Sequence, residues 1–245
     1  MIPTYTFFAV DKGNMTLIEF PNGVSMVVDC RRSETRPSPL EYLKQKGLRR
    51  LDFLVITHPH RDHLSGIEEM CEAIKPKYLW HNGRFFKPDP VYDDWLYYEK
   101  LRNGQLSYCE STKVRAGQTA TIGNAKLYVS APRAPHLEGT TDDENNNGII
   151  LTVTAEKSKV VITGDTQHEQ WDVVDLGPLS NASIFLASHH GRENGFVEEV
   201  METLDPQHIV ISDGEPGDTD ATDEYERFAP VSTTREGSVV VRPQD

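Results

Sequence analysis

The sequence predicts an α/β (α+β) fold in which two packed β-sheets are flanked by helices. Three observations predict it: the chain opens with short β-rich runs, continues with alternating strands and helices, and ends with a second set of strands. The 245 residues contain no repeat, low-complexity block or linker-like stretch that would divide them. We therefore expect a single domain over residues 1–245.

The first part of the chain supplies a meander, two helices and a buried strand. Turn signals, DKGN and PNG, separate three β-rich runs and indicate antiparallel pairing. These runs are residues 4–10, 15–20 and 24–29. A helix over residues 38–47 is expected because Ser38 can cap its N-terminus. Residues 51–57 then read as a buried strand, and Ser65 opens a further helix with Glu68 in the spacing of a capping box.

The rest of the chain alternates between strands and helices. A strand is expected over residues 77–81 and a helix over residues 89–104, in which aromatic residues recur at helical spacing. That aromatic face usually packs on the core, although Trp95, Tyr97 and Tyr98 could instead line a groove and stack on bases. The remaining expected elements are strands over residues 125–132, 148–155, 159–165, 182–188, 208–212 and 238–243, and a helix over 196–204.

Four side chains that can bind a metal stand within six positions directly after the buried strand: His58, His60, Asp62 and His63. In so tight a turn some side chains can face one point while their neighbours face another. This geometry suits two adjacent metals, one bound by His58 and His60 and the other by Asp62 and His63. The alternative is a solvated polar loop, but three of the nine histidines fall here together with an aspartate.

Further ligands are expected at the ends of two later strands. Asp165 ends an apolar run, and a carboxylate there can bridge two cations. Another apolar run ends at the sequence SHHG, which contains His189 and His190. Each could be a capping or surface residue on its own. Their shared position at strand ends, together with the first cluster, favours one metal centre.

Charge and cysteine content restrict the class of protein. Lys and Arg number 25 against 38 Asp and Glu, a net charge of -13, which argues against a broad basic surface for nucleic acid. A polyanionic substrate would have to be held locally, by metal. Cys30, Cys71 and Cys109 form no CxxC pair or disulfide framework, so we expect them in the core of a cytoplasmic protein. The sequence shows no bilayer-spanning run and no signal peptide, so no membrane partner is expected.

The unbroken HxHxDH of residues 58–63 resembles the hallmark of the metallo-β-lactamase superfamily. Within it, the chain is similar to the metallo-β-lactamase-like domain of DNA-uptake competence proteins of the ComEC/Rec2 type. VDKGNMTLIEFPNGVSMVVDC resembles that branch's opening VGQGDxxLIxxPxGxxxLIDxG, and VRAGQTATIGNAKLYVSAP resembles its middle. NNNGIILTV, VVITGD and SHHG are similar to its later motifs. The resemblance covers nearly the whole chain.

The resemblance implies an αββα sandwich of two mixed β-sheets flanked by helices. It also implies that Asp165 bridges two metals and that His190 completes the second site. His189 would then be no ligand but a residue that either supports a ligand from behind or faces the substrate. Many members have a further His as third ligand of the first metal. The candidates for that position here are Asn145, Asn146, His136, His81 or a water, and Asn is a weak, neutral ligand.

The chain departs from the branch at three places. Its opening motif reads Asp11-Lys12-Gly13-Asn14 instead of GQGD, and Arg192 replaces the usual Ser after HHG. The loop commonly written NxxGHP is replaced by GEPGDTDATDE, whose carboxylates should repel an extended phosphate backbone.

The chemistry expected of such a site is hydrolysis by two divalent cations, zinc with manganese as the alternative. They would hold a hydroxide between them for attack on phosphorus. Asp62 and His189 are the expected catalytic residues, with His189 donating a proton to the leaving oxygen. Arg192 and Asn146 are the candidate substrate contacts. Asp29 is a candidate to orient a metal-binding His through a hydrogen bond.

Three functions fit these residues. The preferred one is a phosphodiesterase or nuclease acting on nucleic acid or a nucleotide. The second is a metallohydrolase of a small ester, such as a lactone or a phosphocholine-type ester, which an acidic surface tolerates better. The third is a non-catalytic interaction protein with structural metals, which is disfavoured because structural zinc sites are usually closed and rich in Cys. The oligomeric state and any partner encoded in the same operon stay open.

Overall fold

The predicted meander forms the middle of the first β-sheet. The computed structural model describes residues 1–243. The first three strands pair antiparallel, the next three add in parallel, and the last strand of the chain returns to pair antiparallel with the first. The spatial order is β14 (Val239–Val241), β1 (Thr4–Phe7), β2 (Thr16–Glu19), β3 (Ser25–Val28), β4 (Leu51–Ile56), β5 (Pro76–His81) and β6 (Glu110–Lys113).

The second sheet is built from the later strands of the chain. Its first four strands along the sequence pair antiparallel, and the last three extend the sheet in parallel. The spatial order is β13 (Val231–Thr233), β12 (Ile209–Ile211), β11 (Ile184–Leu186), β10 (Ser158–Ile162), β9 (Ile150–Ala155), β8 (Ala125–Ala131) and β7 (Thr119–Ile122). Both sheets are therefore mixed, as predicted.

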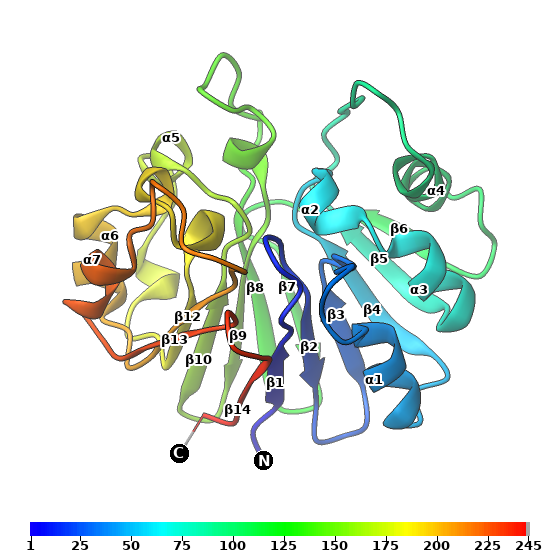
Figure 1. Ribbon diagram of the computed structural model, residues 1–245, viewed down its shortest axis with the longest axis horizontal. Helices are drawn as coiled ribbons and strands as arrows, with labels where there is room; N and C mark the ends of the chain where they lie inside the picture. Colours follow the sequence, from blue (N-terminus) through cyan, green and yellow to red (C-terminus); the bar gives the residue numbers. More distant parts are fainter. Residues whose placement is uncertain (244–245) are drawn as a thin grey trace.

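Helices cover the outer face of each sheet, which completes the predicted αββα sandwich. In Figure 1 the helices of the first half and those of the second half lie on opposite sides of the sheets. The first group is α1 (Pro39–Gln45), α2 (Arg61–Leu64), α3 (Ile67–Ala73) and α4 (Asp93–Arg102). The second group is α5 (His168–Trp171), α6 (Glu198–Leu204) and α7 (Thr222–Glu226). Short 3-10 helices are η1 (Asn145–Asn147), η2 (Gly177–Leu179), η3 (Ser188–Gly191) and η4 (Glu193–Gly195).

Three apolar layers hold the sandwich together, and the alternation of side chains along each strand assigns residues to them. In β4, Val55 packs between the two sheets, whereas its neighbours Leu54 and Ile56 pack beneath α1, α3 and α4. Both faces of the strand are thus buried, which explains the continuous apolar run in the sequence. A third layer lies between the second sheet and α6 and α7, around Phe185 and Tyr225.

Two local predictions turned out differently. Ser65 does not cap the N-terminus of a helix. The turn that carries the candidate ligands folds as α2 and ends at Ser65, so α3 begins after Gly66, without a side-chain cap. The Ser65 hydroxyl instead accepts from Arg31 Nη1 at 2.8 Å. Several short elements were also not predicted: β6, β7, β13, α5 and α7. Of these, β6 carries no apolar pattern.

Burial decides between the two interpretations of the aromatic helix. Trp95, Tyr97 and Tyr98 are 6%, 8% and 1% exposed and belong to the layer beneath the first sheet's helices. The packing interpretation is therefore confirmed, and the groove interpretation of these three rings is wrong. The three cysteines are also buried and unpaired, as expected. Among residues 1–243, no helix is both long and apolar enough to cross a membrane.

The packing of α4 can be tested by truncating one buried and one exposed side chain of the same helix. Tyr98→Ala should lower the free energy of unfolding by about 3 to 5 kcal/mol, the range for removing an aromatic ring from a core. Leu96 is 45% exposed, so Leu96→Ala should change it by about 0.5 kcal/mol or less. Urea denaturation followed by circular dichroism measures both, and equal losses would contradict the packing described.

Candidate metal centre

The turn after β4 places its four polar side chains where the two sheets meet. His58 lies two residues after the end of the strand and is fully buried. His60 then stands at the N-terminus of α2, and Asp62 and His63 lie within that single helical turn. The rings of His58 and His63 have centroids 4.1 Å apart, and those of His58 and His60 4.8 Å apart. The turn therefore brings its three imidazoles into one group.

A buried aspartate fixes the orientation of His63. Asp29 follows β3 with φ of 56° and is 1% exposed. Its carboxylate accepts hydrogen bonds from the Thr57 backbone N–H at 2.8 Å and from the Thr57 hydroxyl. It also lies 2.7 Å from His63 Nδ1. With Nδ1 donating to Asp29, the Nε2 atom of His63 carries the free lone pair and faces Asp165.

Asp165 reaches the centre from the second sheet, at the end of β10. The preceding Gly164 has φ of +55°, and a Cβ there would lie 2.9 Å from the Thr57 side chain. Glycine is therefore needed for the close approach of this loop to the end of β4. The Asp165 carboxylate is 2% exposed and lies 3.1 Å from His63 Nε2 and 3.9 Å from His58 Nε2.

The adjacent pair after β11 diverges because both residues have left-handed backbone conformations. His189 has φ of 49° and His190 has φ of 59°. The His190 Nδ1 donates to the Ser212 carbonyl at 3.1 Å, and its Nε2 lies 3.3 Å from Asp165 Oδ2. The Nδ1 of His189 is instead 2.7 Å from Asn194 Oδ1, while its Nε2 is 3.7 Å from Asp165 Oδ2. His190 is fully buried, and His189 is partly exposed at the rim.

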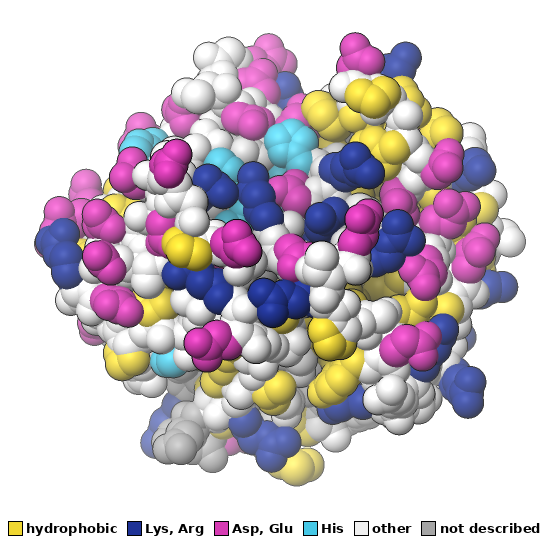
Figure 2. All heavy atoms as spheres, viewed as in Figure 1, with side chains coloured by type: hydrophobic (Ala, Val, Ile, Leu, Met, Phe, Trp, Pro, Cys, Tyr) yellow, Lys and Arg dark blue, Asp and Glu magenta, His cyan; other side chains and the backbone are white. Residues whose placement is uncertain are grey.

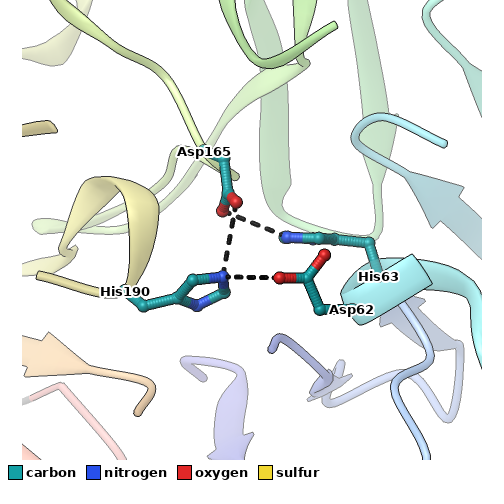
Figure 3. Close-up of side chains that lie close together, drawn as sticks. All are labelled: Asp62, His63, Asp165 and His190. Carbon is teal, nitrogen blue, oxygen red and sulfur yellow. Dashed lines mark ion pairs between the residues drawn. The ribbon is translucent and has the colours of Figure 1, made fainter. Parts of the chain in front are cut away.

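Figure 3 shows the side chains of Asp62, His63, Asp165 and His190 pointing toward one another. One ligand atom from each lies within 4.8 Å of the others. Four buried atoms here have no hydrogen-bond partner within the described chain; they are His58 Nε2, His63 Nε2, His190 Nε2 and Asp165 Oδ1. The short distance from His63 Nε2 to Asp165 Oδ1 thus lacks the alignment of a hydrogen bond. Unpaired buried nitrogen and oxygen atoms are costly, and divalent cations would satisfy them, so this donor set fits a metal centre.

The charges of the centre are strongly coupled. Burial holds the pKa of His58 well below its usual value, and neighbouring His63 lowers it further, so His58 is a neutral donor. Burial also lowers the pKa of His190, but the Asp165 carboxylate outweighs it and raises that pKa to about 9. Burial would raise the pKa of Asp165, yet His190 and His63 hold it well below its usual range. The buried carboxylate therefore attracts positive charge, and cations would compete with protons for these imidazoles.

The structure separates the candidates for a third ligand of the first metal. Asn145 Oδ1 is buried without a hydrogen-bond partner, in a segment that contacts β4 through the hydrogen bond from Ile149 N to Thr57 O at 3.0 Å. The Asn146 amide is instead hydrogen-bonded to the side chains of Thr140 and Glu169 and to the Gln170 backbone. This arrangement favours Asn145 and leaves no free amide atom on Asn146 for the predicted substrate contact.

The two histidines among the third-ligand candidates are engaged elsewhere. His136 Nε2 lies 3.1 Å from the Asn82 carbonyl oxygen. His81 Nδ1 accepts from the Gly83 backbone N–H at 3.0 Å, and burial, with Arg102 and Lys113 nearby, lowers its pKa to about 4. Neither belongs to the group of imidazoles around Asp165.

The loop that contains Lys12 also reaches the candidate metal centre. Lys12 belongs to the opening motif that departs from the competence branch, and no role was predicted for it. Gly13 has φ of +138°, and a Cβ there would collide with the Asp62 carbonyl oxygen. The next residue, Asn14, donates its backbone N–H to that same oxygen at 3.2 Å. The loop thus packs closely against α2. As a result, Lys12 Nζ lies 3.9 Å from Asp62 Oδ2. Only this contact, invisible in sequence, places Lys12 at the metal centre.

Arg192 lies on the same rim, although its guanidinium does not enter the group of metal ligands. Its Nη1 donates to Thr219 Oγ1 at 3.0 Å, and its Nε is buried without a partner in the described chain. Arg192 and Lys12 line a pocket of about 630 Å³, whose other charged lining residues are Arg36, Asp11, Asp213 and Glu215. Figure 2 shows Lys and Arg side chains gathered beside the exposed histidines on this face.

Comparison with known proteins assigns the fold and the family. The model of the beta-lactamase superfamily domain matches residues 25–188. The chain is 24% identical over 176 residues to ComE operon protein 3 of Bacillus subtilis (strain 168), covering 71% of this chain and 21% of that protein. It is 31% identical over 169 residues to the anti-Pycsar protein Apyc1 of Bacillus phage vB_BsuM-Goe3, covering 64% of this chain and 62% of that protein. It therefore spans less than two thirds of either relative.

A solved structure shows the same architecture. The metallo-beta-lactamase fold protein YhfI from Bacillus subtilis superposes with a TM-score of 0.62 at 14% identity, covering 98% of this chain and 99% of that one. The resemblance seen in the sequence motifs is therefore confirmed, both for the superfamily and for the competence branch.

Substitution of Asp165, the carboxylate expected to bridge two metals, tests the centre. Asp165→Asn should lower the affinity for divalent metal at both sites by at least about 10-fold, since even an outer hydrogen-bond partner contributes that much. Asp62→Ala should mainly empty the second site. Asp172→Asn is the matched control, because Asp172 is an exposed aspartate a few positions later in the sequence. Elemental analysis after dialysis against limiting zinc measures all three, and full occupancy in Asp165→Asn would remove the bridge from this description.

The two adjacent histidines should differ in the same measurement. His190→Ala should lose metal because its buried Nε2 lies 3.3 Å from Asp165 Oδ2. His189→Ala should keep its metal content within about 20% of the wild type, since its Nδ1 is already bound to Asn194 outside the ligand group. The opposite pattern would reverse the assignment of the two residues.

Proposed function

The chain belongs to the beta-lactamase superfamily, and from this premise we propose that it is a metal-dependent phosphodiesterase with two divalent cations. The observation that supports it best is the convergence of unpaired, buried imidazole and carboxylate atoms at one point, beside two cationic side chains. The first cation would be held by His58 and His60, the second by Asp62, His63 and His190, with Asp165 between them. Zinc is the preferred metal, with manganese as the alternative.

Such cations supply Lewis acidity and an activated water at neutral pH. The side chains of the protein then have three tasks: to hold the cations, to neutralise the charge of the substrate, and to donate a proton to the leaving oxygen. The ligands hold the centre rigidly, because Asp29 and the Ser212 carbonyl fix the rings of His63 and His190. Lys12 and Arg192 at the rim offer positive charge to the non-bridging oxygens of a phosphodiester.

His189 is the proposed proton donor to the leaving oxygen. Its Nδ1 is held by Asn194, so its Nε2 is directed toward the centre, 3.7 Å from Asp165 Oδ2. Burial lowers the pKa of His189, and this outweighs the opposing effect of Asp165. The donor role therefore requires the protonated imidazolium form, whose fraction falls as the pH rises through that lowered pKa. A partly exposed imidazole beside the reacting group can both give a proton and recover it from solvent.

A short substrate fits the charges of the rim better than an extended strand. The loop over residues 214–224 reaches the rim, since Arg192 pairs with Asp220 in a β-bridge and donates to Thr219. Its carboxylates and the net charge of -13 disfavour a long polyanion. We therefore favour a nucleotide over a nucleic acid, and keep hydrolysis of a small ester, a lactone or a phosphocholine-type ester, as the second candidate. The buried, unpaired cysteines support the cytoplasm as its compartment.

A hydrolysis screen tests the proposal. The zinc- or manganese-loaded protein is incubated with bis-p-nitrophenyl phosphate, a cyclic dinucleotide, single-stranded DNA and a lactone, with Asp165→Asn as the inactive control. Turnover of the phosphodiesters supports the proposal, and faster turnover of the dinucleotide than of DNA supports the short substrate. Turnover of the lactone alone would establish the second candidate instead.

In the same assay, His189→Ala should lower kcat by roughly 10² to 10⁴ while metal is retained, as expected for loss of general acid catalysis. The loss should shrink with a substrate whose leaving group is p-nitrophenol, because this group departs without protonation. An equal loss with both leaving groups would show that His189 has another task.

A further inference from the structure

The segment between β5 and α4 exposes apolar side chains beside the metal centre. Two of the six large hydrophobic side chains that are exposed in the described chain fall within it, Phe85 at 65% and Val91 at 40%, and Leu96 at 45% follows in α4. Figure 2 shows the hydrophobic side chains of this region gathered next to the histidines. Soluble proteins rarely expose a large contiguous group of apolar side chains unless it binds a ligand or a partner.

Phe86 connects this apolar group to the centre. Its ring lies 5.2 Å from the ring of His60, centroid to centroid, at an interplanar angle of 70°. His60 is only partly buried, so the contact lies at the mouth of the centre and not in its floor. Phe86 itself is half-buried, so part of its ring is open to solvent.

The backbone that carries the two phenylalanines is held from several directions. The Phe86 carbonyl accepts from the Trp95 indole N–H at 3.0 Å, and the Arg84 carbonyl accepts from Arg102. The Arg84 guanidinium donates to Glu144 at 2.6 Å and to the Asp143 carboxylate at 3.1 Å. These bonds tie the segment both to α4 and to the residues that precede η1.

The guanidinium of Arg102 also lies over the Phe85 ring, 5.8 Å from its centroid. Two aromatic rings are thus presented to solvent on a segment that is fixed before any ligand arrives. A fixed aromatic surface loses little conformational entropy on binding, which favours recognition of a flat group.

We propose that Phe86, with Phe85 beside it, is the surface on which the planar ring of a nucleotide substrate stacks while its phosphate lies at the metal centre. This inference rests on the proposed function and adds to it the part of the substrate that is recognised away from phosphorus. The cations Lys12 and Arg192 then bind the phosphate side, and the phenylalanines bind the base. The occupant is a base because a flat apolar ring, Phe86, lies against His60, and the Arg102 guanidinium over Phe85 is compatible with a neutral planar group.

The inference predicts which variants change binding of the base alone. The metal-loaded protein is titrated by calorimetry with adenosine 5′-monophosphate and with ribose 5-phosphate, which lacks the base. Phe86→Leu should weaken binding of the nucleotide by about 5- to 100-fold, the range for loss of one stacked base, and leave ribose 5-phosphate within about 2-fold. Phe86→Trp should restore it. Val240→Ala, which removes another exposed hydrophobic side chain, is the matched control and should change neither.

Kinetics supply the second readout. Thymidine 5′-(p-nitrophenyl phosphate) and methyl p-nitrophenyl phosphate have the same leaving group, and only the first carries a base. Phe86→Leu should raise KM for the first substrate and leave kcat/KM for the second unchanged, at equal metal content. Equal effects on both substrates, or no effect on either titration, would overturn the inference.

The two proposals fail in different ways. Turnover of methyl p-nitrophenyl phosphate with a Phe86-independent preference for the base would leave the proposed function standing and remove the stacking surface. Base-dependent binding without turnover of any phosphodiester would do the reverse. If Phe86→Leu dissociates a dimer in light scattering and leaves both titrations unchanged, the apolar group belongs to a second copy of the chain and the inference is wrong.

Discussion

The carboxylate of Asp165, buried at the meeting line of the two sheets, is the constraint on which the rest of the centre depends. A buried carboxylate is stable only if positive charge or hydrogen-bond donors surround it. Here the imidazoles of His63 and His190 lie within 3.3 Å, and the one from His58 within 3.9 Å. Two cations would satisfy the same requirement more completely. The need for compensating charge thus explains why ligands from both halves of the chain converge on this point.

The backbone conformations around the centre follow from that convergence. Because Gly164 has no side chain, the loop after β10 can approach the Thr57 side chain closely. Gly13 in the same way allows the loop after β1 to contact the Asp62 carbonyl oxygen. The left-handed conformations of His189 and His190 turn one ring into the centre and the other toward the rim. Conformations of this kind cost energy and are kept where the surrounding contacts enforce them. Rigidity at the centre is therefore a property of the packing of both sheets.

The rim of the centre has two chemically different sides. Lys12 lies 3.9 Å from Asp62 and lines a pocket with Arg192, whereas the Phe86 ring contacts the ring of His60. A chain with a net charge of -13 can accept an anionic ester only where local positive charge outweighs the overall field. On the apolar side, a flat group could stack on a phenyl ring and bury one face away from water. Together they match the substrate proposed above, which is anionic at one end and planar at the other.

The sequence by itself determined the elements with strong local signals. Apolar runs gave most of the strands and fixed the sandwich, because strands buried on both faces cannot be mistaken for exposed segments. The spacing of His58, His60, Asp62 and His63 and the position of Asp165 after a strand also gave the candidate ligands, since these depend on neighbours along the chain.

Only the tertiary structure decided features that depend on residues far apart in sequence. In the folded chain the Ser65 hydroxyl accepts a hydrogen bond from Arg31 and does not cap a helix. The Asn146 amide donates to Glu169, and Lys12 lies near the Asp62 carboxylate. The tertiary structure also buried the aromatic face of α4 and exposed Phe85 just before it. In each case the local pattern permits two environments, and the choice between them rests on long-range contacts that no spacing along the chain encodes.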